Sequence, residues 1–143
     1  MDNLRVASTV VINSPKSNVW RAITEPAELI QWYAPGCRWE IPELRAGAVL
    51  RFFNTETDIL SATIEVVRPQ KFLSMRWQPD NRFPSATLQN TYELDDEGDS
   101  TRVTIAQTGY ETAPADVRQQ WFQQDEQAFT AIAAALKNHV EQR

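Results

Sequence analysis

Three polar side chains lie at strand positions whose other members are apolar. Segments 86–94 and 101–108 alternate between two sets of residues, and the mainly apolar set contains Asn90, Tyr92 and Gln107. A buried amide or hydroxyl without a partner costs about 1–3 kcal/mol, so such groups require internal water, a polar network or a bound ligand. The pattern alone leaves these three interpretations open.

General acid–base chemistry in such an interior would depend on Asp125 and Tyr92. Burial can raise the pKa of a carboxyl group toward neutrality, which suits proton transfer. The single histidine, His139, lies near the end of the last expected helix, and Cys37 has no histidine beside it in the sequence. We assign neither a catalytic role, and an enzyme is kept as an alternative.

Composition excludes several other functions. The chain has 143 residues, a net charge of −5, one cysteine, one histidine and four glycines. This inventory cannot supply a disulfide or a Cys/His zinc site, and no glycine-rich phosphate loop or dinucleotide motif occurs. We predict no metal and no cofactor. The acidic balance disfavours nucleic acid, and the longest apolar run, 131–136, is too short for membrane insertion.

Length and the N-terminal segment indicate domain organisation and location. A chain of 143 residues is typical of one domain, so we expect residues 1–143 to fold as a single unit. Segment 1–8 lacks the basic start and the continuous apolar stretch of a signal peptide. We therefore expect a cytoplasmic protein.

Alternation of apolar and polar residues predicts a sheet. Seven strands are expected, at 4–13, 39–42, 48–53, 59–68, 71–78, 86–94 and 101–108. The polar segment between the last two strands contains Gly98 and suits a tight reversal. The strands after the first should therefore form an antiparallel sheet.

Three helices are expected around this sheet. Ser14, followed by Pro15, is expected to cap a first short helix, and a second short helix begins after Glu25. A long helix is expected from Pro114 to about residue 140. Its apolar stripe contains Val117, Trp121, Ala128, Ile132, Leu136 and Val140.

A long helix with one apolar stripe and a sheet with one apolar face must cover each other, so we predict an α+β fold with the helix lying in a curved antiparallel sheet. Trp39, Trp77, Tyr92 and Trp121 then face the space beneath the helix. These rings either fill that space as core or surround a cavity.

The opening helical region carries a recognisable motif. The pattern Ser-Pro-x-x-x-Val-Trp-Arg-Ala-Ile-Thr-x-Pro-x-x-Leu-x-x-Trp runs from Ser14 to Trp32. It resembles the START-like, or birch-pollen-allergen-like, superfamily, and more narrowly the activator of heat-shock protein 90 ATPase homologue family. Weaker matches follow in order over nearly the whole chain. The usual Gly-Gly is replaced by Ala46-Gly47, and the Gly-Trp of the last helix by Ala128-Phe129.

This resemblance implies a helix-grip fold, with seven strands wrapped around the C-terminal helix and a cavity between them. Many members of the superfamily bind an apolar or amphipathic molecule there, such as a lipid or a polyketide. A few are cyclases, and some of the narrower family act on a chaperone. Its alignment also favours Val49, Arg51 and Phe53 as the inward residues of their strand.

An inward Arg51 needs a partner, because an unpaired buried charge is costly. Asp125 lies on the helix between Trp121 and Ala128, and the two charges are expected either to form an internal ion pair or to leave Arg51 free for an anionic ligand. The remaining alternative is that one of them lies at the wet rim and meets neither partner.

We predict that the protein binds a small apolar or aromatic ligand with a polar or anionic group. The alternatives are a cyclase- or isomerase-type enzyme and a chaperone-regulating interaction module. A cavity below about 300 Å³ would favour the interaction module. The predicted ligand-binding residues are Trp39, Arg51, Phe53, Trp77, Asn90, Tyr92, Gln107, Trp121 and Asp125.

Overall fold

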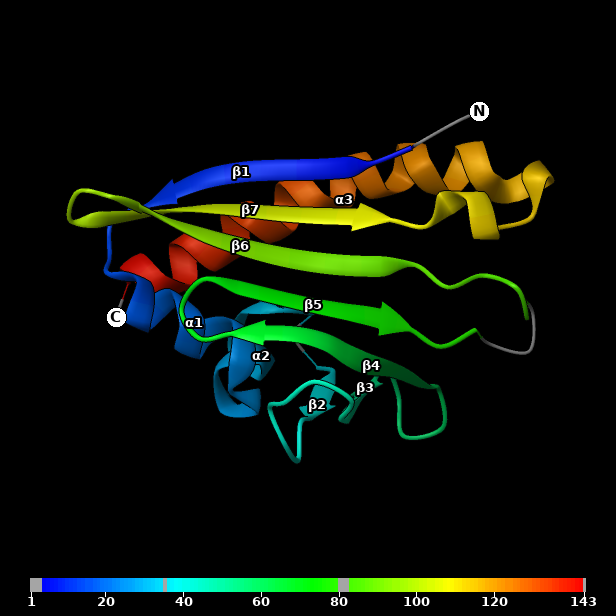
Figure 1. Cartoon of the computed structure of the whole chain (residues 1–143), viewed down its shortest axis with the longest axis horizontal. Coiled ribbons are helices and arrows are strands. Elements are labelled where there is room, and N and C mark those ends of the chain that lie inside the picture. Colours follow the sequence, from blue (N-terminus) through cyan, green and yellow to red (C-terminus); the bar gives the residue numbers. More distant parts are fainter. Residues whose placement is uncertain (1–3, 35, 80–82, 143) are drawn as a thin grey trace.

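The computed structural model describes residues 4–34, 36–79 and 83–142 of the chain. Its sheet contains β1 Val6–Ile12, β2 Arg38–Glu40, β3 Val49–Phe53, β4 Ile59–Arg68, β5 Phe72–Trp77, β6 Gln89–Glu97 and β7 Ser100–Thr108. Its helices are α1 Lys16–Thr24, α2 Pro26–Trp32, the short 3-10 helix η1 Tyr110–Thr112, and α3 Ala115–Glu141. Figure 1 shows this order along the chain.

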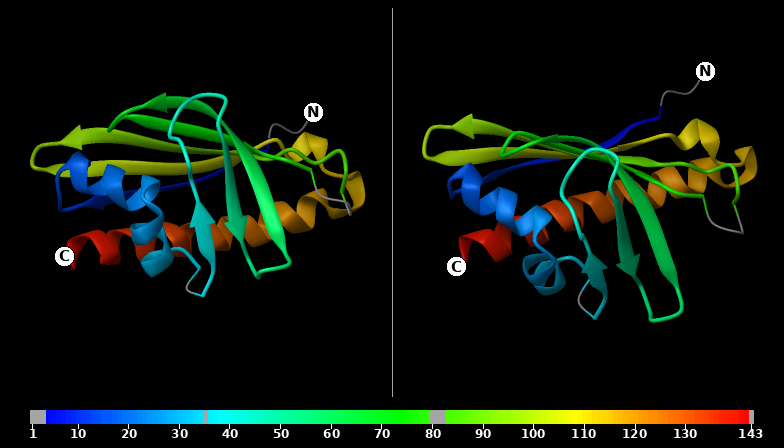
Figure 2. Two further views of the ribbon diagram at one scale, coloured as in Figure 1. Left: turned by 90° about the horizontal axis from the view of Figure 1, so that it is seen from below. Right: turned by 60° about the horizontal axis from the view of Figure 1, so that its bottom comes forward.

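The seven strands form one antiparallel sheet in the order β1-β7-β6-β5-β4-β3-β2. The sheet curls around α3, and α1 and α2 cover one end of the space between them (Figure 2). This confirms the predicted α+β helix-grip architecture. The first strand, β1, pairs with the last, β7, so the N-terminal strand lies at one edge of the sheet beside the C-terminal strand.

The long helix α3 buries one side against the sheet. Its buried residues are Phe129, Ala133, Leu136 and Val140. Ala128, predicted on the apolar stripe, is exposed, because Phe129 takes the inward position one residue later. No helix within the described ranges, α3 included, has a stretch apolar enough to span a membrane.

The last turns of α3 also reach the free edge of the sheet. Lys137 Nζ donates to the carbonyl of Val11 on β1 at 2.7 Å, and Glu141 Oε2 accepts from the backbone N–H of Asn13 at 2.7 Å. The two side chains bind each other at 2.6 Å. One backbone group of the edge strand and one just after its end are thereby satisfied by side chains of a helix.

Strand β3 faces the opposite way from the expectation. Leu50 is buried at 2% exposure and Phe52 faces the interior, whereas Val49 is 43% exposed and Arg51 is exposed. The prediction that Val49, Arg51 and Phe53 point inward is therefore wrong. Both sets contain large apolar side chains, so hydrophobic alternation did not distinguish them.

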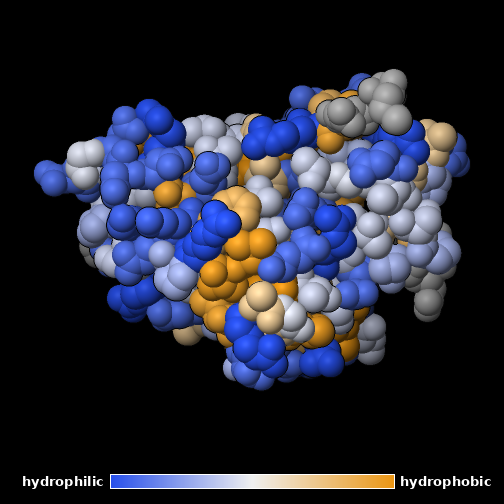
Figure 3. Space-filling view, in the orientation of Figure 1, coloured by the Kyte–Doolittle hydropathy of each residue, from blue (hydrophilic) through white to orange (hydrophobic). Residues whose placement is uncertain are grey.

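Phe53 is buried, but on the outer face. Its ring lies beneath the Arg38 guanidinium, whose central carbon is 3.6 Å from the ring centroid. The outer face is otherwise largely hydrophilic, with hydrophobic surface gathered over β4 and β5 (Figure 3). An aromatic side chain can thus be buried outside the core when a cationic side chain covers it.

One local prediction is also wrong, and one strand departs from strict alternation. Ser14 does not cap α1: the N-cap is Pro15, and the Ser14 hydroxyl accepts from Asn18 Nδ2 at 2.9 Å. On β4 the register shifts between Ile64 and Val66, so Val67 rather than Val66 packs against the core. A β-bulge of this kind reverses which residues face inward, and alternation cannot reveal it.

Gly109 connects β7 to η1 through a close backbone approach. Its φ is +97°, and a Cβ at this position would lie 2.7 Å from the carbonyl oxygen of Thr87. We expect Gly109→Ala to destabilise the protein by about 3 kcal/mol, because left-handed strain and a backbone clash act together. Urea unfolding measures the loss.

Gly36→Ala is the matched control, since Gly36 has φ +95° and no atom within 4 Å of its Cβ position. It should lose only about 1 kcal/mol, the cost of the strain alone. Equal losses in the two variants would show that the approach to Thr87 does not matter.

Candidate functional site

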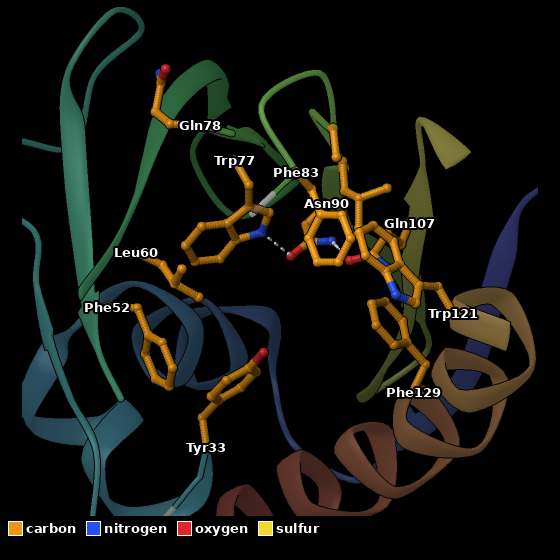
Figure 4. A pocket seen from close by; sticks show the side chains of 12 residues that line it. Tyr33, Phe52, Leu60, Trp77, Gln78, Phe83, Asn90, Gln107, Trp121 and Phe129 are labelled. Carbon is orange, nitrogen blue, oxygen red and sulfur yellow. Dashed lines mark hydrogen bonds between the residues drawn. The ribbon is translucent and has the colours of Figure 1, made fainter. Parts of the chain in front are cut away.

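A cavity of about 270 Å³ lies between the inner face of the sheet and α3. The sheet contributes Phe52, Leu60, Trp77, Asn90 and Gln107, together with Leu88 just before β6. The other walls are Tyr33 after α2, Trp121 and Phe129 on α3, and Gln78, Phe83 and Ala86 in the β5–β6 connection. Figure 4 shows Tyr33, Phe52 and Trp77 facing Trp121 and Phe129 across a common space, whereas the Gln78 side chain points away from it.

A row of hydrogen bonds crosses the roof of this cavity from β5 to α3. The Trp77 indole Nε1 donates to Asn90 Oδ1 at 2.8 Å, and Asn90 Nδ2 donates to Gln107 Oε1 at 2.6 Å (Figure 4). Gln107 Nε2 donates to Asp125 Oδ2 and to the Tyr110 hydroxyl, each at 2.8 Å. Tyr110 donates in turn to Asp125 Oδ2 at 2.7 Å. Five side chains from five elements therefore form one network.

The two ends of the row fix the orientation of both amides. An indole N–H only donates and a carboxylate only accepts, so the oxygen of Asn90 must face Trp77 and the nitrogen of Gln107 must face Asp125. Each amide oxygen uses one lone pair within the row, which leaves a second lone pair available. Asn90 also keeps a second N–H. The wall can therefore accept from and donate to a polar group in the cavity.

Burial raises the pKa of the Asp125 carboxyl, and the hydrogen bonds from Tyr110 and Gln107 oppose this shift by stabilising the ionised form. The pKa of Tyr110 is raised as well, first by burial and then by its hydrogen bond to Asp125. The network thus holds a carboxylate in a place that would otherwise favour its neutral form.

Two tyrosine hydroxyls lie outside this row. Burial raises the pKa of both Tyr33 and Tyr92. Tyr33 points its hydroxyl into the cavity (Figure 4), whereas Tyr92 lines a separate void of about 10 Å³. Within the described part of the chain, neither hydroxyl has a hydrogen-bond partner.

Some of the aromatic rings fill the interior as core, and others surround a cavity; the sequence had left both alternatives open. Trp39 packs against Phe52, Tyr33 and Trp77, with centroid separations of 4.8, 5.1 and 6.1 Å. Trp39 itself is buried core beside the small void. Its three partners line the larger cavity, so this cluster forms the boundary between filled interior and open space.

The predicted site residues fall into three groups. Trp77, Asn90, Gln107 and Trp121 line the cavity together, and Asp125 lies behind Gln107. Trp39 and Tyr92 line the neighbouring void. Arg51 and Phe53 lie on the outer face. Of the three alternatives for Arg51 and Asp125, the structure therefore favours the last, in which Arg51 meets neither Asp125 nor a ligand, and the carboxylate is held by Gln107 and Tyr110.

Charge in and around the cavity differs from the expectation accordingly. None of the twelve lining residues is Lys, Arg, His, Asp or Glu. The charged group joined to the wall through a hydrogen bond is the Asp125 carboxylate, which is negative when ionised. Asp125 and Tyr92 also belong to different parts of the interior, so the structure does not assemble them as an acid–base pair.

Several lining residues were not predicted as ligand-binding residues. Phe52 belongs to the strand set that was placed outward, and Phe129 occupies the position after Ala128 in the altered Gly-Trp motif. Phe83 packs edge-on against Trp121 with centroids 4.8 Å apart. The altered motif was the signal for Phe129, but Phe83 lies in a connection where periodicity carries no information.

Comparison with known proteins gives one family. The profile of the family described as activator of Hsp90 ATPase homolog 1-like protein matches residues 13–141. No curated protein matches the chain.

Solved structures share the whole fold at low identity. Protein MLL2253 from Mesorhizobium loti has a TM-score of 0.82 and 18% identity, covering 96% of this chain and 97% of that one. The Aha1 dimer from Colwellia psychrerythraea has a TM-score of 0.74 and 13% identity, covering 96% of each chain. DynU16, in the dynemicin biosynthetic locus, has a TM-score of 0.75 and 20% identity, covering 98% of this chain and 48% of that one.

Titration of Asp125 should make stability depend on pH. Because its pKa is raised in the folded state, this group contributes stability below its unfolded-state pKa and loses it as pH rises through the folded-state pKa. Asp125→Asn removes the titration. The free energy of unfolding of the wild type, minus that of the variant, should therefore be larger at about pH 4 than at about pH 7.

Urea unfolding across this pH range measures the difference. Tyr110→Phe is the companion variant. It removes a hydroxyl that stabilises the Asp125 carboxylate, so the pH range over which Asp125 titrates in the folded protein should move to higher pH. A difference that stays flat, or grows with pH, would contradict the raised pKa.

Proposed function

The chain belongs to the activator of Hsp90 ATPase homolog 1-like family, and from this premise we propose that it binds a small, uncharged, ring-bearing molecule in the cavity between the sheet and α3. The observation that carries the proposal is the hydrogen-bonded amide row on the roof of an otherwise apolar cavity. Sites for small molecules combine apolar walls with a few placed polar groups in this way.

The size of the cavity supports a small ligand. At about 270 Å³ it lies just under the usual range of about 300–1,000 Å³ for drug-sized ligands. One or two fused rings match this space better than a long lipid or a large polyketide held entirely inside. Trp77, Trp121 and Phe129 offer aromatic surfaces against which such rings pack.

The charge around the cavity favours a neutral molecule. An anion would lose its hydration and gain no cationic partner, because Arg51 is outside and Asp125 lies behind the wall. A hydroxyl suits the amides better, since it can donate to a free lone pair of Gln107 or Asn90 and accept the remaining Asn90 N–H. The proposal therefore replaces the expected anionic group with a neutral donor–acceptor group.

Binding of a neutral two-ring probe tests this function. We expect titration calorimetry to show micromolar affinity for 2-naphthol and at least about tenfold weaker binding of 2-naphthoate. Leu60→Trp, which fills the cavity, should abolish binding of 2-naphthol. Ile59→Trp is the matched control, because Ile59 is the adjacent residue and is 43% exposed.

Binding of 2-naphthol that survives Leu60→Trp, with Ile59→Trp equally active, would place the ligand elsewhere. Preference for 2-naphthoate over 2-naphthol would overturn the neutral-ligand assignment. No binding of either probe to the wild type would count against the ligand-binding function itself.

The amide row should discriminate a hydroxyl-bearing ring from a plain one. We expect the wild type to bind 2-naphthol about tenfold more tightly than naphthalene, the equivalent of one hydrogen bond. Asn90→Leu should reduce this ratio to near one, and calorimetry with both probes measures it. Thr91→Val, at the next residue of β6 and outside both the row and the cavity wall, is the control and should keep the ratio.

A variant that loses the fold would bind neither probe, so circular dichroism accompanies the Asn90→Leu titration. Gln107→Leu provides a second test of the same ratio. An unchanged ratio in folded Asn90→Leu and Gln107→Leu would show that the amides do not contact the ligand.

The family description and the cavity size together favour one further candidate, regulation of a chaperone ATPase in the cytoplasm. The cavity falls just below the size at which we expected an interaction module to become the better interpretation. Leu60→Trp separates the two functions. An interaction module should keep its effect on heat-shock protein 90 ATPase turnover in this variant, whereas a ligand-dependent protein should lose its ligand response.

A further inference from the structure

We propose that the protein has a second, outer subsite that takes the apolar tail of the same ligand, and this inference rests on the proposed function. The subsite is a groove of about 430 Å³ between the end of α2, β3 and α3. We call it the outer groove. Its walls include Trp32, Tyr33, Phe52, Ala131, Ile132 and Ala135.

The outer groove adjoins the cavity at two rings. Among the residues that the structure describes, Tyr33 and Phe52 alone line both spaces. Their centroids are 5.9 Å apart at an interplanar angle of 83°, so an edge-to-face pair of side chains lies between the two spaces. A shift of either ring joins the two spaces.

The position of Tyr33 makes such a shift inexpensive. Its ring is held by edge contacts with Trp32 and Trp39, at 5.5 and 5.1 Å, and within the described residues its hydroxyl has no hydrogen-bond partner to lose. The next residue, Ala34, has φ +50°, a left-handed conformation that costs an alanine roughly 1 kcal/mol or more. Strain of this kind beside a ligand site is a common feature of segments that change conformation.

The groove has the chemistry of an apolar tail site. Its remaining lining residues, Ala34 and Asn54, are uncharged like the other six, on a chain in which 23% of residues are charged. On α3 this wall is formed by small or aliphatic side chains, those of Ala131, Ile132 and Ala135. A methylene chain gains from burial against such a surface and needs no polar partner.

The shared boundary with the cavity decides between a ligand tail and a protein partner. An occupant of both spaces must pass where the rings of Tyr33 and Phe52 meet, and a shift of one ring admits a single alkyl chain but not a helix or a strand. The ligand class is therefore a hydroxylated ring, held at Asn90 and Gln107, that carries an unbranched alkyl tail directed toward α2.

A series of 4-alkylphenols from ethyl to octyl tests the inference by calorimetry, below the concentration at which the longer members aggregate. Affinity should rise about threefold for each added methylene and continue to rise through 4-octylphenol. In Ala131→Trp, which fills the outer groove, affinity should stop rising at a short chain while 4-ethylphenol binds as in the wild type. Ala134→Trp is the control, because Ala134 is exposed on the same helix and does not line the groove.

Three results would overturn the outer subsite. One is a plateau at the same chain length in the wild type and in Ala131→Trp; another is a rise that Ala131→Trp does not change. The third is a wild-type dimer in sedimentation that only Ala131→Trp disrupts, with no effect on chain-length dependence, which would assign the groove to a second copy. In each case binding of 4-ethylphenol persists, whereas failure of the proposed function would remove binding of every member of the series.

Discussion

One carboxylate oxygen, Asp125 Oδ2, orders the interior of this protein. It accepts from both Tyr110 and Gln107, so it ties α3 to η1 and to β7 at a single point. Because Gln107 must donate to this oxygen, its own oxygen faces Asn90, and the oxygen of Asn90 in turn faces the indole N–H of Trp77 on β5. The polarity of the cavity wall is thus determined by a group that does not itself line the cavity. Tyr110 reaches that group because Gly109 lets the chain turn tightly against the segment before β6.

The architecture was predictable because its signals are local and repeated. Each strand except β3 has one polar and one apolar set of residues, and α3 repeats its apolar positions over many turns. The two short helices were predicted from Ser14-Pro15 and from the restart of the chain after Glu25, and the family motif agrees with them. Each local expectation that the structure contradicts has a physical cause. A bulge between Ile64 and Val66 changes which residues face inward without changing composition, and Arg38 covers Phe53, which is buried on the outer face.

The site was only partly predictable, because a cavity is lined by residues that are distant in the sequence and come together only in the fold. Asn90 and Gln107 were found as polar residues in apolar strand sets, and they do lie side by side in the cavity roof. Tyr110, the residue that holds Asp125 with them, follows β7 in a short 3-10 helix where alternation has ended. Arg51 was misplaced for the opposite reason: its strand has two apolar faces, and a charge there could be assigned to either.

The contact between α3 and the free edge of β1 bears on whether the protein aggregates at high concentration. An uncovered edge strand is a template on which another chain can add a strand, and such growth leads to aggregation. Here Lys137 occupies a hydrogen-bonding position of that edge and Glu141 binds the residue just after it, and the strand at the opposite edge, β2, is only three residues long. Both ends of the sheet are therefore poor templates, and the helix that closes the cavity also limits the growth of the sheet.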